Sequence, residues 1–216
     1  FIERAAYKPL RNAPRMSVMI SAIGVSYLLE NTATYVTGGQ PMTYPTIGIL
    51  NKTIDIVGTS TKLVVIITPV LVLVLIVLLT QLINHTKIGM AMRAVSKDFE
   101  TARLMGIKIN NVISMTFVIG SALAVVGSIL YFTTYPAITP TAGAMPGLKA
   151  FVAAVFGGIG SIPGAMLGGI LLGLIEQMSK TYISTLWADA IVFAVLVVVL
   201  VVKPTGLLGK PMQEKV

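Results

Sequence analysis

The sequence predicts an all-α, polytopic membrane protein with about five transmembrane helices, a short re-entrant half-helix and a helix in a cytoplasmic loop. Of its 216 residues, 55% are hydrophobic and 11% are charged, whereas soluble domains carry roughly 25% charged residues. The cations behind the net charge of +8 lie between long apolar runs. This placement indicates membrane topology and argues against nucleic-acid binding, which uses a basic face with interleaved aromatic residues.

The first predicted span is Met16 to Val36, which is long enough to cross roughly 30 Å of hydrocarbon as a helix. Positive residues accumulate on the cytoplasmic side of membranes, so the cations before this run predict an outward direction. They are Arg4, Lys8, Arg11 and Arg15. The chain opens on this charged segment without an initiator Met, and we expect its true N-terminus to be missing.

An external loop is predicted over Thr37 to Thr61, because glycine, proline and threonine are frequent there. Apolar alternation around this loop predicts a small hairpin about Asn51 and Lys52; the alternating residues are Ile47, Ile49, Ile54 and Val57. The uniformly apolar run Leu63 to Asn84 then returns the chain to the cytoplasm, and a membrane helix tolerates its Pro69.

The polar loop from His85 to Lys108 contains five cations and two acids, which predicts a cytoplasmic position. Within it, a small amphipathic helix is expected, with Asp98 as its N-cap, Glu100 near its positive end and Gly106 as a left-handed stop. Its apolar side, Phe99, Ala102 and Met105, is suited to burial against another protein. The alternative is a solvated, positive linker.

Beyond this loop, Asn111 to Tyr135 predicts an outward span with a close-packing face at Gly120, Ala124 and Gly127. Leu148 to Phe156 is too short to span, and predicts a half-helix that stops at residues 157–163. Two further helices, Gly164 to Ile183 and Ala190 to Val202, leave both chain ends in the cytoplasm. The sequence therefore predicts one transmembrane domain over residues 1–216, with the loop at 85–108 inside it.

Small residues at four-residue spacing predict close helix contacts after the half-helix. They are Gly160, Gly164 and Gly168, with Gly169 and Gly173 as a second pair. Glu176 shares the face of Gly169 and Gly173, and so points toward protein. It either lines a permeation path, as membrane carboxylates often do, or pairs with Lys180 at i+4.

Glu30 and Asn31 pose a similar choice about 20 Å along the first span. They either handle a polar solute or hydrogen-bond a neighbouring helix. Asp189, at the start of the last helix, suits a capping or dipole role.

Catalytic and metal sites are not expected. His85 is the single histidine, and cysteine is absent from the sequence, so neither a histidine-based triad nor a thiolate metal site can be assembled. The glycines of GGIGSIPG lack the Lys-Ser/Thr pair of a phosphate-binding loop. Any nucleotide hydrolysis would therefore belong to another subunit.

The loop GMAMRAVSKDFETARLMGI resembles the cytoplasmic coupling loop of bacterial ABC-importer permeases of the branched-chain amino acid class. Four further stretches resemble the same family in the same order: YKPLR (7–11), GGQP (38–41), FVAAVFGGIGSIPGAMLGG (151–169) and KPTGLLG (203–209). They point to its LivH-like members. The loop positions that match are Gly89, Arg93, Ala94, Ala102 and Gly106, to which we add the cap Asp98 as a candidate ATPase-coupling residue.

The resemblance implies a non-catalytic, inner-membrane transport subunit that binds no cofactor itself. Its expected partners are two cytoplasmic ATPases that bind ATP and Mg²⁺, a second, LivM-like permease and an extracytoplasmic solute-binding protein. The cargo would be a branched-chain or related amino acid, and the C-terminus would be cytoplasmic. The alternative is a secondary transporter driven by an ion gradient, which would use Glu30, Glu176 and the broken 157–163 region.

Overall fold

The computed structural model describes residues 2–10, 15–45, 52–56 and 59–209. Their contacts divide the chain into two compact units, Phe1–Thr141 and Ala142–Val216. Most of the described residues are helical, and three of the helices are long and apolar enough to cross a membrane. A mainly helical membrane protein is thus confirmed, while its organisation as one permease domain stays a prediction.

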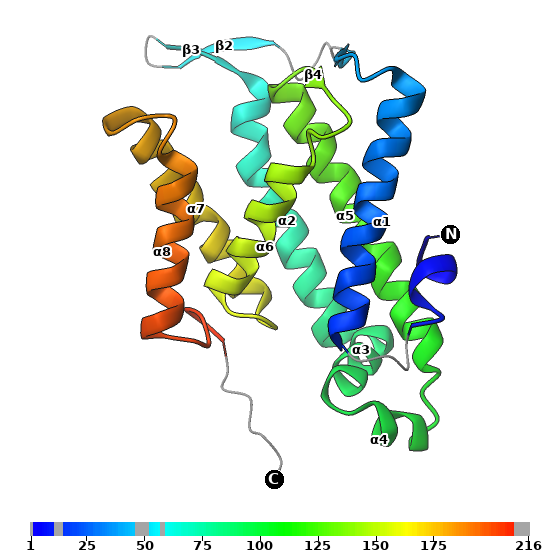
Figure 1. The fold of residues 1–216 in the computed structure, drawn as a ribbon. Coiled ribbons are helices and arrows are strands. Elements are labelled where there is room, and N and C mark those ends of the chain that lie inside the picture. Colours follow the sequence, from blue (N-terminus) through cyan, green and yellow to red (C-terminus); the bar gives the residue numbers. More distant parts are fainter. Residues whose placement is uncertain (1, 11–14, 46–51, 57–58, 210–216) are drawn as a thin grey trace. The chain divides into compact units, whose positions relative to one another are not determined.

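Three long helices form most of the first unit: α1 (Arg15–Thr37), α2 (Leu63–His85) and α5 (Ile109–Thr134) (Figure 1). Their bounds lie within two residues of the predicted apolar runs, because each run is long and bounded by polar or charged residues. α2 and α5 are apolar enough to span a membrane. α1 is not among those spans, since Glu30 and Asn31 lower the hydropathy of its second half.

The loop after α2 contains two helices, α3 (Lys87–Lys97) and α4 (Phe99–Leu104), at the His85 end of α2 (Figure 1). The predicted small helix capped by Asp98 is confirmed as α4, whereas α3 was not predicted. Asp98 adopts an extended conformation between the two helices, which ends α3 and caps α4. The spacing of Ile88, Met92 and Val95, an i, i+4, i+7 pattern, is the sequence signal for the missed helix.

A hairpin is present in the predicted loop, but it lies further along the chain than the predicted hairpin about Asn51 and Lys52. β2 (Thr53–Ile56) pairs antiparallel with β3 (Thr59–Lys62), and Lys52 precedes β2. The sequence between the strands is Val57-Gly58, and glycine favours a two-residue turn. The remaining residues used for the prediction, Ile47, Ile49, Asn51 and Val57, lie outside the described residues.

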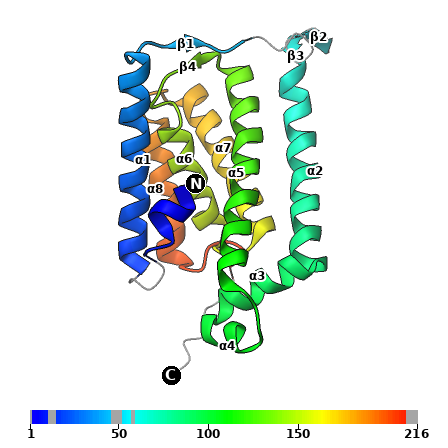
Figure 2. The same ribbon diagram turned by 90° about the vertical axis from the view of Figure 1, so that its right-hand side faces the viewer.

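A second, unexpected strand pair joins the ends of two long helices. β1 (Met42–Thr43), after α1, pairs antiparallel with β4 (Ala137–Ile138), after α5 (Figure 2). The two partners are far apart in the sequence, so local patterns could not predict this pair. The N-terminal segment contributes a short π-helical turn, η1 (Glu3–Tyr7), to the same unit.

The second unit consists of α6 (Ala144–Gly157), α7 (Ile162–Tyr182) and α8 (Ala188–Val202). The predicted short helix is present as α6, which begins four residues earlier than predicted; its 14 residues extend about 21 Å, less than the roughly 30 Å of hydrocarbon. The helical conformation is interrupted at residues 158–161, before α7 begins. Buried apolar side chains from all three helices form the core of this unit: Val152, Phe156, Leu172 and Val192.

Candidate functional site

The junction between α2 and α3 is fixed by a cap and a close backbone contact. The Thr86 hydroxyl accepts a hydrogen bond from the Gly89 amide at 3.1 Å, as an N-cap residue does. Gly89 is buried, and a Cβ atom at this position would overlap the backbone of Ile83. A larger residue would therefore push the first turn of α3 away from the end of α2.

Arg93 holds the same junction from the outside. Its guanidinium donates to the Asn84 side-chain oxygen at 3.2 Å and to the Asn84 carbonyl at 3.3 Å. Such paired, charge-assisted bonds orient the two groups more firmly than a single bond would. Ala94, the next candidate, is half-buried, and its carbonyl accepts the amide of Asp98 at the end of α3.

α4 is capped at both ends as the sequence predicts. The Asp98 carboxylate accepts the amides of Glu100 at 2.9 Å and Thr101 at 3.2 Å, and also the Thr101 hydroxyl at 2.7 Å. Gly106 has φ of +79°, the left-handed conformation that ends a helix. These bonds keep a helix of only six residues in place.

The three apolar residues predicted to form one side of this helix differ in exposure. Ala102 is 3% exposed and packs inside the chain, whereas Phe99 is 53% and Met105 79% exposed. Leu104, which the sequence reasoning missed, is 87% exposed. Contacts of α4 with α3 and α5 decide which side is covered. The residues available to another protein are therefore Phe99, Leu104 and Met105.

Glu176 belongs to a cluster of four charged side chains in the second unit. Its Oε1 atom lies 2.8 Å from Lys149 Nζ and 2.5 Å from Lys180 Nζ. Lys149 Nζ also lies 2.7 Å from Asp189 Oδ1, and thereby connects α6, α7 and α8. The i+4 pair with Lys180 was one of the two predicted alternatives, and Lys149 was missed. A lone lysine in the apolar run of α6 was the signal that could have revealed it.

Asp189 combines two roles. It lies in the first turn of α8, where its negative charge interacts favourably with the helix dipole, as predicted. Its ion pair with Lys149 adds a tertiary contact that sequence spacing did not indicate.

The other two candidates for a solute path, Glu30 and Asn31, lie on α1 in the first unit. The Asn31 side-chain amide donates to the Tyr27 carbonyl at 2.7 Å, within its own helix. Thr34 donates likewise to the Glu30 carbonyl at 2.7 Å, and the Glu30 side chain is half-buried. Neither of the predicted roles for this pair is tested by these bonds.

Two of the five predicted packing glycines make close contacts. A Cβ at Gly164 would overlap the carbonyl of Gly157, and one at Gly168 would overlap that of Ala153. At Gly169 the added Cβ would make an ordinary contact of 3.9 Å with Ala153. At Gly160 and Gly173, no atom of the described chain lies within 4 Å of such a Cβ.

Two of the sequence stretches that resemble the family meet in the second unit. The amides of Leu207 and Leu208, in KPTGLLG, donate to the carbonyls of Phe156 and Gly157, each at 2.9 Å. Lys203 Nζ donates to the Leu207 carbonyl at 2.7 Å and holds the turn. These bonds satisfy carbonyls at the C-terminal end of α6, which would otherwise lack partners.

Among the described residues, no group of three or more His, Asp or Glu side chains could hold a metal ion. The candidate residues instead form two features: the capped α3–α4 loop, and a cluster of two cations and two carboxylates that connects α6, α7 and α8.

Comparison with known proteins identifies the chain's relatives. A family model described as the permease component of branched-chain amino acid transport systems matches residues 5–200. The chain is 44% identical over 221 residues to the high-affinity branched-chain amino acid permease protein LivH of Salmonella typhimurium. It is 42% identical to LivH of Escherichia coli K12 over 219 residues and to BraD of Pseudomonas aeruginosa over 221 residues.

Each of these three alignments covers 100% of this chain and 71% of the relative. No solved structure matches the chain significantly. The family match extends from η1 to α8, and so includes both the α3–α4 loop and the charge cluster. The chain therefore belongs to the family of permease components of branched-chain amino acid transport systems.

Proposed function

We propose that this chain forms part of the translocation path of an ATP-binding-cassette importer for branched-chain or related amino acids, and that α4 docks on an ATPase subunit. One observation supports the docking proposal: α4 is capped and anchored through the buried Ala102, while Phe99, Leu104 and Met105 are exposed. Exposed apolar residues on a fixed helix are suited to a protein partner. The relatives are named as branched-chain amino acid permeases, which supports the proposed class of solute.

The proposed partners follow from the family. Two cytoplasmic ATPases would bind ATP and Mg²⁺, a second, LivM-like permease would complete the path, and an extracytoplasmic protein would deliver the solute. This chain would bind no cofactor. Because the family is one of permeases, the chain is a transport component and not an enzyme.

The proposed topology places α3 and α4 on the cytoplasmic side of a bacterial inner membrane. Helices α1, α2, α5, α7 and α8 would cross the membrane, α6 would enter it as a half-helix, and the C-terminus would be cytoplasmic. The cations in the α3–α4 loop, such as Arg93 and Arg103, support this orientation.

The junction between α2 and α3 suits the transmission of movement. Arg93 bonds to Asn84, and Gly89 packs against Ile83, so a displacement of α3 would carry the end of α2 with it. Rigid elements that move together are the usual means by which a distant binding event shifts a membrane path. We therefore propose that six residues keep this coupling element rigid: Gly89, Arg93, Ala94, Asp98, Ala102 and Gly106.

Charge balance in the Lys149 cluster supports a structural role for Glu176. Two ammonium groups contact its carboxylate, so Glu176 has no unpaired charge with which to bind a coupling ion. This pairing disfavours the alternative of a secondary transporter. Glu30 and Asn31 remain candidates for the path.

Leu104→Asp tests the docking. Leu104 is more suitable than the buried Ala102, since a charge at Ala102 would also disturb the loop's own packing. We expect the substitution to reduce ATP-driven leucine uptake at least about tenfold, because a desolvated carboxylate in an apolar contact costs several kcal/mol. Uptake is measured in proteoliposomes that contain the complete transporter.

The matched control is Leu186→Asp, at a leucine that is 91% exposed in the segment between α7 and α8. This control should transport normally. Normal uptake by Leu104→Asp, with ATPases still bound, would refute docking through α4. Uptake that persists without ATP would favour an ion-driven mechanism.

A further inference from the structure

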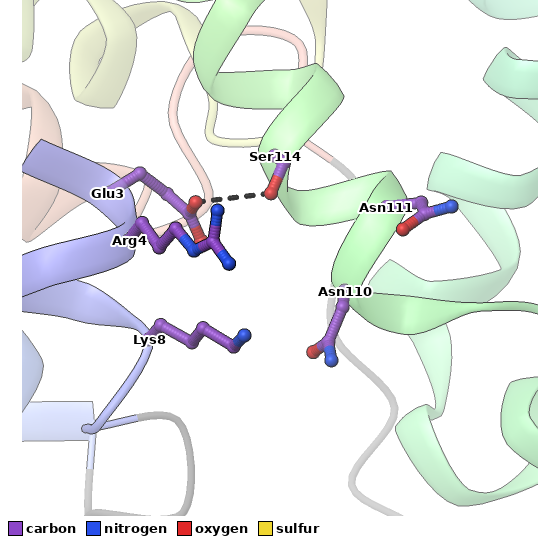
Figure 3. A pocket seen from close by; sticks show the side chains of 6 residues that line it. All are labelled: Glu3, Arg4, Lys8, Asn110, Asn111 and Ser114. Atoms are coloured by element: carbon purple, nitrogen blue, oxygen red, sulfur yellow. Dashed lines mark hydrogen bonds between the residues drawn. The ribbon is translucent and has the colours of Figure 1, made fainter. Parts of the chain in front are cut away.

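A pocket of about 190 Å³ lies between the N-terminal segment and the first turns of α5. The described residues that line it are all polar or charged: Glu3, Arg4, Lys8, Asn110, Asn111 and Ser114 (Figure 3). Its volume is smaller than the roughly 300–1,000 Å³ of sites that enclose drug-sized ligands. The pocket therefore suits a small polar group and not a whole apolar solute.

Two contacts hold the N-terminal segment against α5 and give the pocket its shape. The Ser114 hydroxyl donates to the Glu3 carboxylate at 3.1 Å. The rings of Tyr7 and Phe117 stack with centroids 5.2 Å apart. Glu3 and Tyr7 are four residues apart, and Ser114 and Phe117 three, so one face of each segment carries both contacts.

The same geometry brings the cations of one segment toward the amides of the other. Arg4 and Lys8 are four residues apart and extend from the N-terminal segment toward the Asn110 side of α5 (Figure 3). Both side chains are exposed. Among the described lining residues, two are cationic and one, Glu3, is anionic, a balance that suits an anionic group.

The pocket lies at the first turns of α5, where the headgroups would lie for a membrane that this helix enters at its first turn. α5 begins at Ile109 and is apolar enough to span a membrane. Ser114, the deepest lining residue, is five residues further and so lies about 7.5 Å along the helix. The polar region of each leaflet is about 6 Å thick. Tyr7 is an aromatic type that is common at this depth.

We propose that this pocket binds the phosphodiester group of a membrane phospholipid. Arg4 and Lys8 supply charge-assisted donors to the phosphate, and the side-chain amides of Asn110 and Asn111 supply neutral donors. The acyl chains extend from the pocket along the apolar surface of α5. This site goes beyond the proposed function, because binding of a lipid here requires no role in solute transfer or ATPase docking. Free phosphate shares the headgroup's chemistry and is the competing ligand.

The test measures how much dioleoylphosphatidylglycerol the purified full chain retains, by native mass spectrometry from detergent. Arg4→Gln/Lys8→Gln should weaken binding about 10- to 30-fold, because each basic residue near the lipid surface contributes about fivefold. Lys52→Gln/Lys62→Gln removes the same charge at β2 and β3 and should bind as the unchanged chain does. Dioleoylglycerol, which lacks the phosphate, should not bind the pocket.

A second variant protects the test against misfolding of the first. Asn111→Asp places a negative charge in the pocket and favours the N-terminal end of α5, so the helix is retained while lipid binding falls. Equal lipid retention by the pocket variants and the unchanged chain would overturn the proposal. So would an equal loss in the Lys52/Lys62 control, which would indicate general charge attraction. Displacement of the lipid by inorganic phosphate at equal concentration would assign the pocket to free phosphate instead.

Discussion

At the scale of single residues, Lys149 has the most consequential position in the second unit. It contacts carboxylates on two other helices, whereas Lys180 contacts one on its own helix. The side chains of Lys149 and Glu176 are 26% and 19% exposed. Removal of one partner from such a partly buried set leaves the others desolvated without compensation.

Lys149→Met should therefore lower the free energy of unfolding by about 1–3 kcal/mol, because Asp189 loses its ion pair and Glu176 keeps one of two. Lys180→Met is the matched control. It should cost less than about 1 kcal/mol, since Lys180 is the more exposed partner and Glu176 keeps Lys149. Thermal unfolding of both variants in detergent provides the comparison. Equal losses would contradict a bridging role for Lys149.

At the scale of elements, α6 and α7 are held together by direct backbone contact. Gly168 on α7 approaches the carbonyl of Ala153 on α6, and Ser161 caps α7 through the amide of Gly164 at 3.1 Å. Small residues permit this proximity, and van der Waals contacts then replace the hydrophobic effect that is weak in lipid. The half-helix is thus supported along its length by α7.

Gly168→Ala should destabilise the second unit, since its methyl group would overlap backbone atoms that cannot move aside as a side chain can. Overpacking of this kind typically costs about 1–3 kcal/mol. The control is Gly173→Ala on the same helix, where the described chain leaves open space and alanine's higher helix propensity acts alone. It should be neutral or stabilising by up to about 1 kcal/mol. The unfolding midpoint should therefore fall for Gly168→Ala and stay unchanged or rise for Gly173→Ala.

At the scale of the whole molecule, the orientation in the membrane determines what each site can meet. The α3–α4 loop must face the cytoplasm if it docks on an ATPase, and the β2–β3 hairpin, at the other end of α2, must then face outward (Figure 1). The sequence contains no cysteine, so single introduced cysteines report orientation without background.

Thr53→Cys and Ser96→Cys test the orientation as a pair, since both positions are exposed and they lie beyond opposite ends of α2. A membrane-impermeant maleimide should label Thr53→Cys in intact cells. Ser96→Cys should be labelled only after permeabilisation. The reverse pattern would place α4 outside the cell and exclude the proposed coupling.

The sequence determined the features that depend on local composition. Apolar runs fixed α1, α2 and α5 to within two residues, and Asp98 and Gly106 defined α4, because caps and left-handed stops act over one turn. Only the tertiary structure decided which side of α4 is covered, that Lys149 bridges α6 to α7 and α8, and that β1 pairs with β4. These contacts join residues distant in the chain, and their energies depend on distance and desolvation, which helical or strand periodicity does not encode.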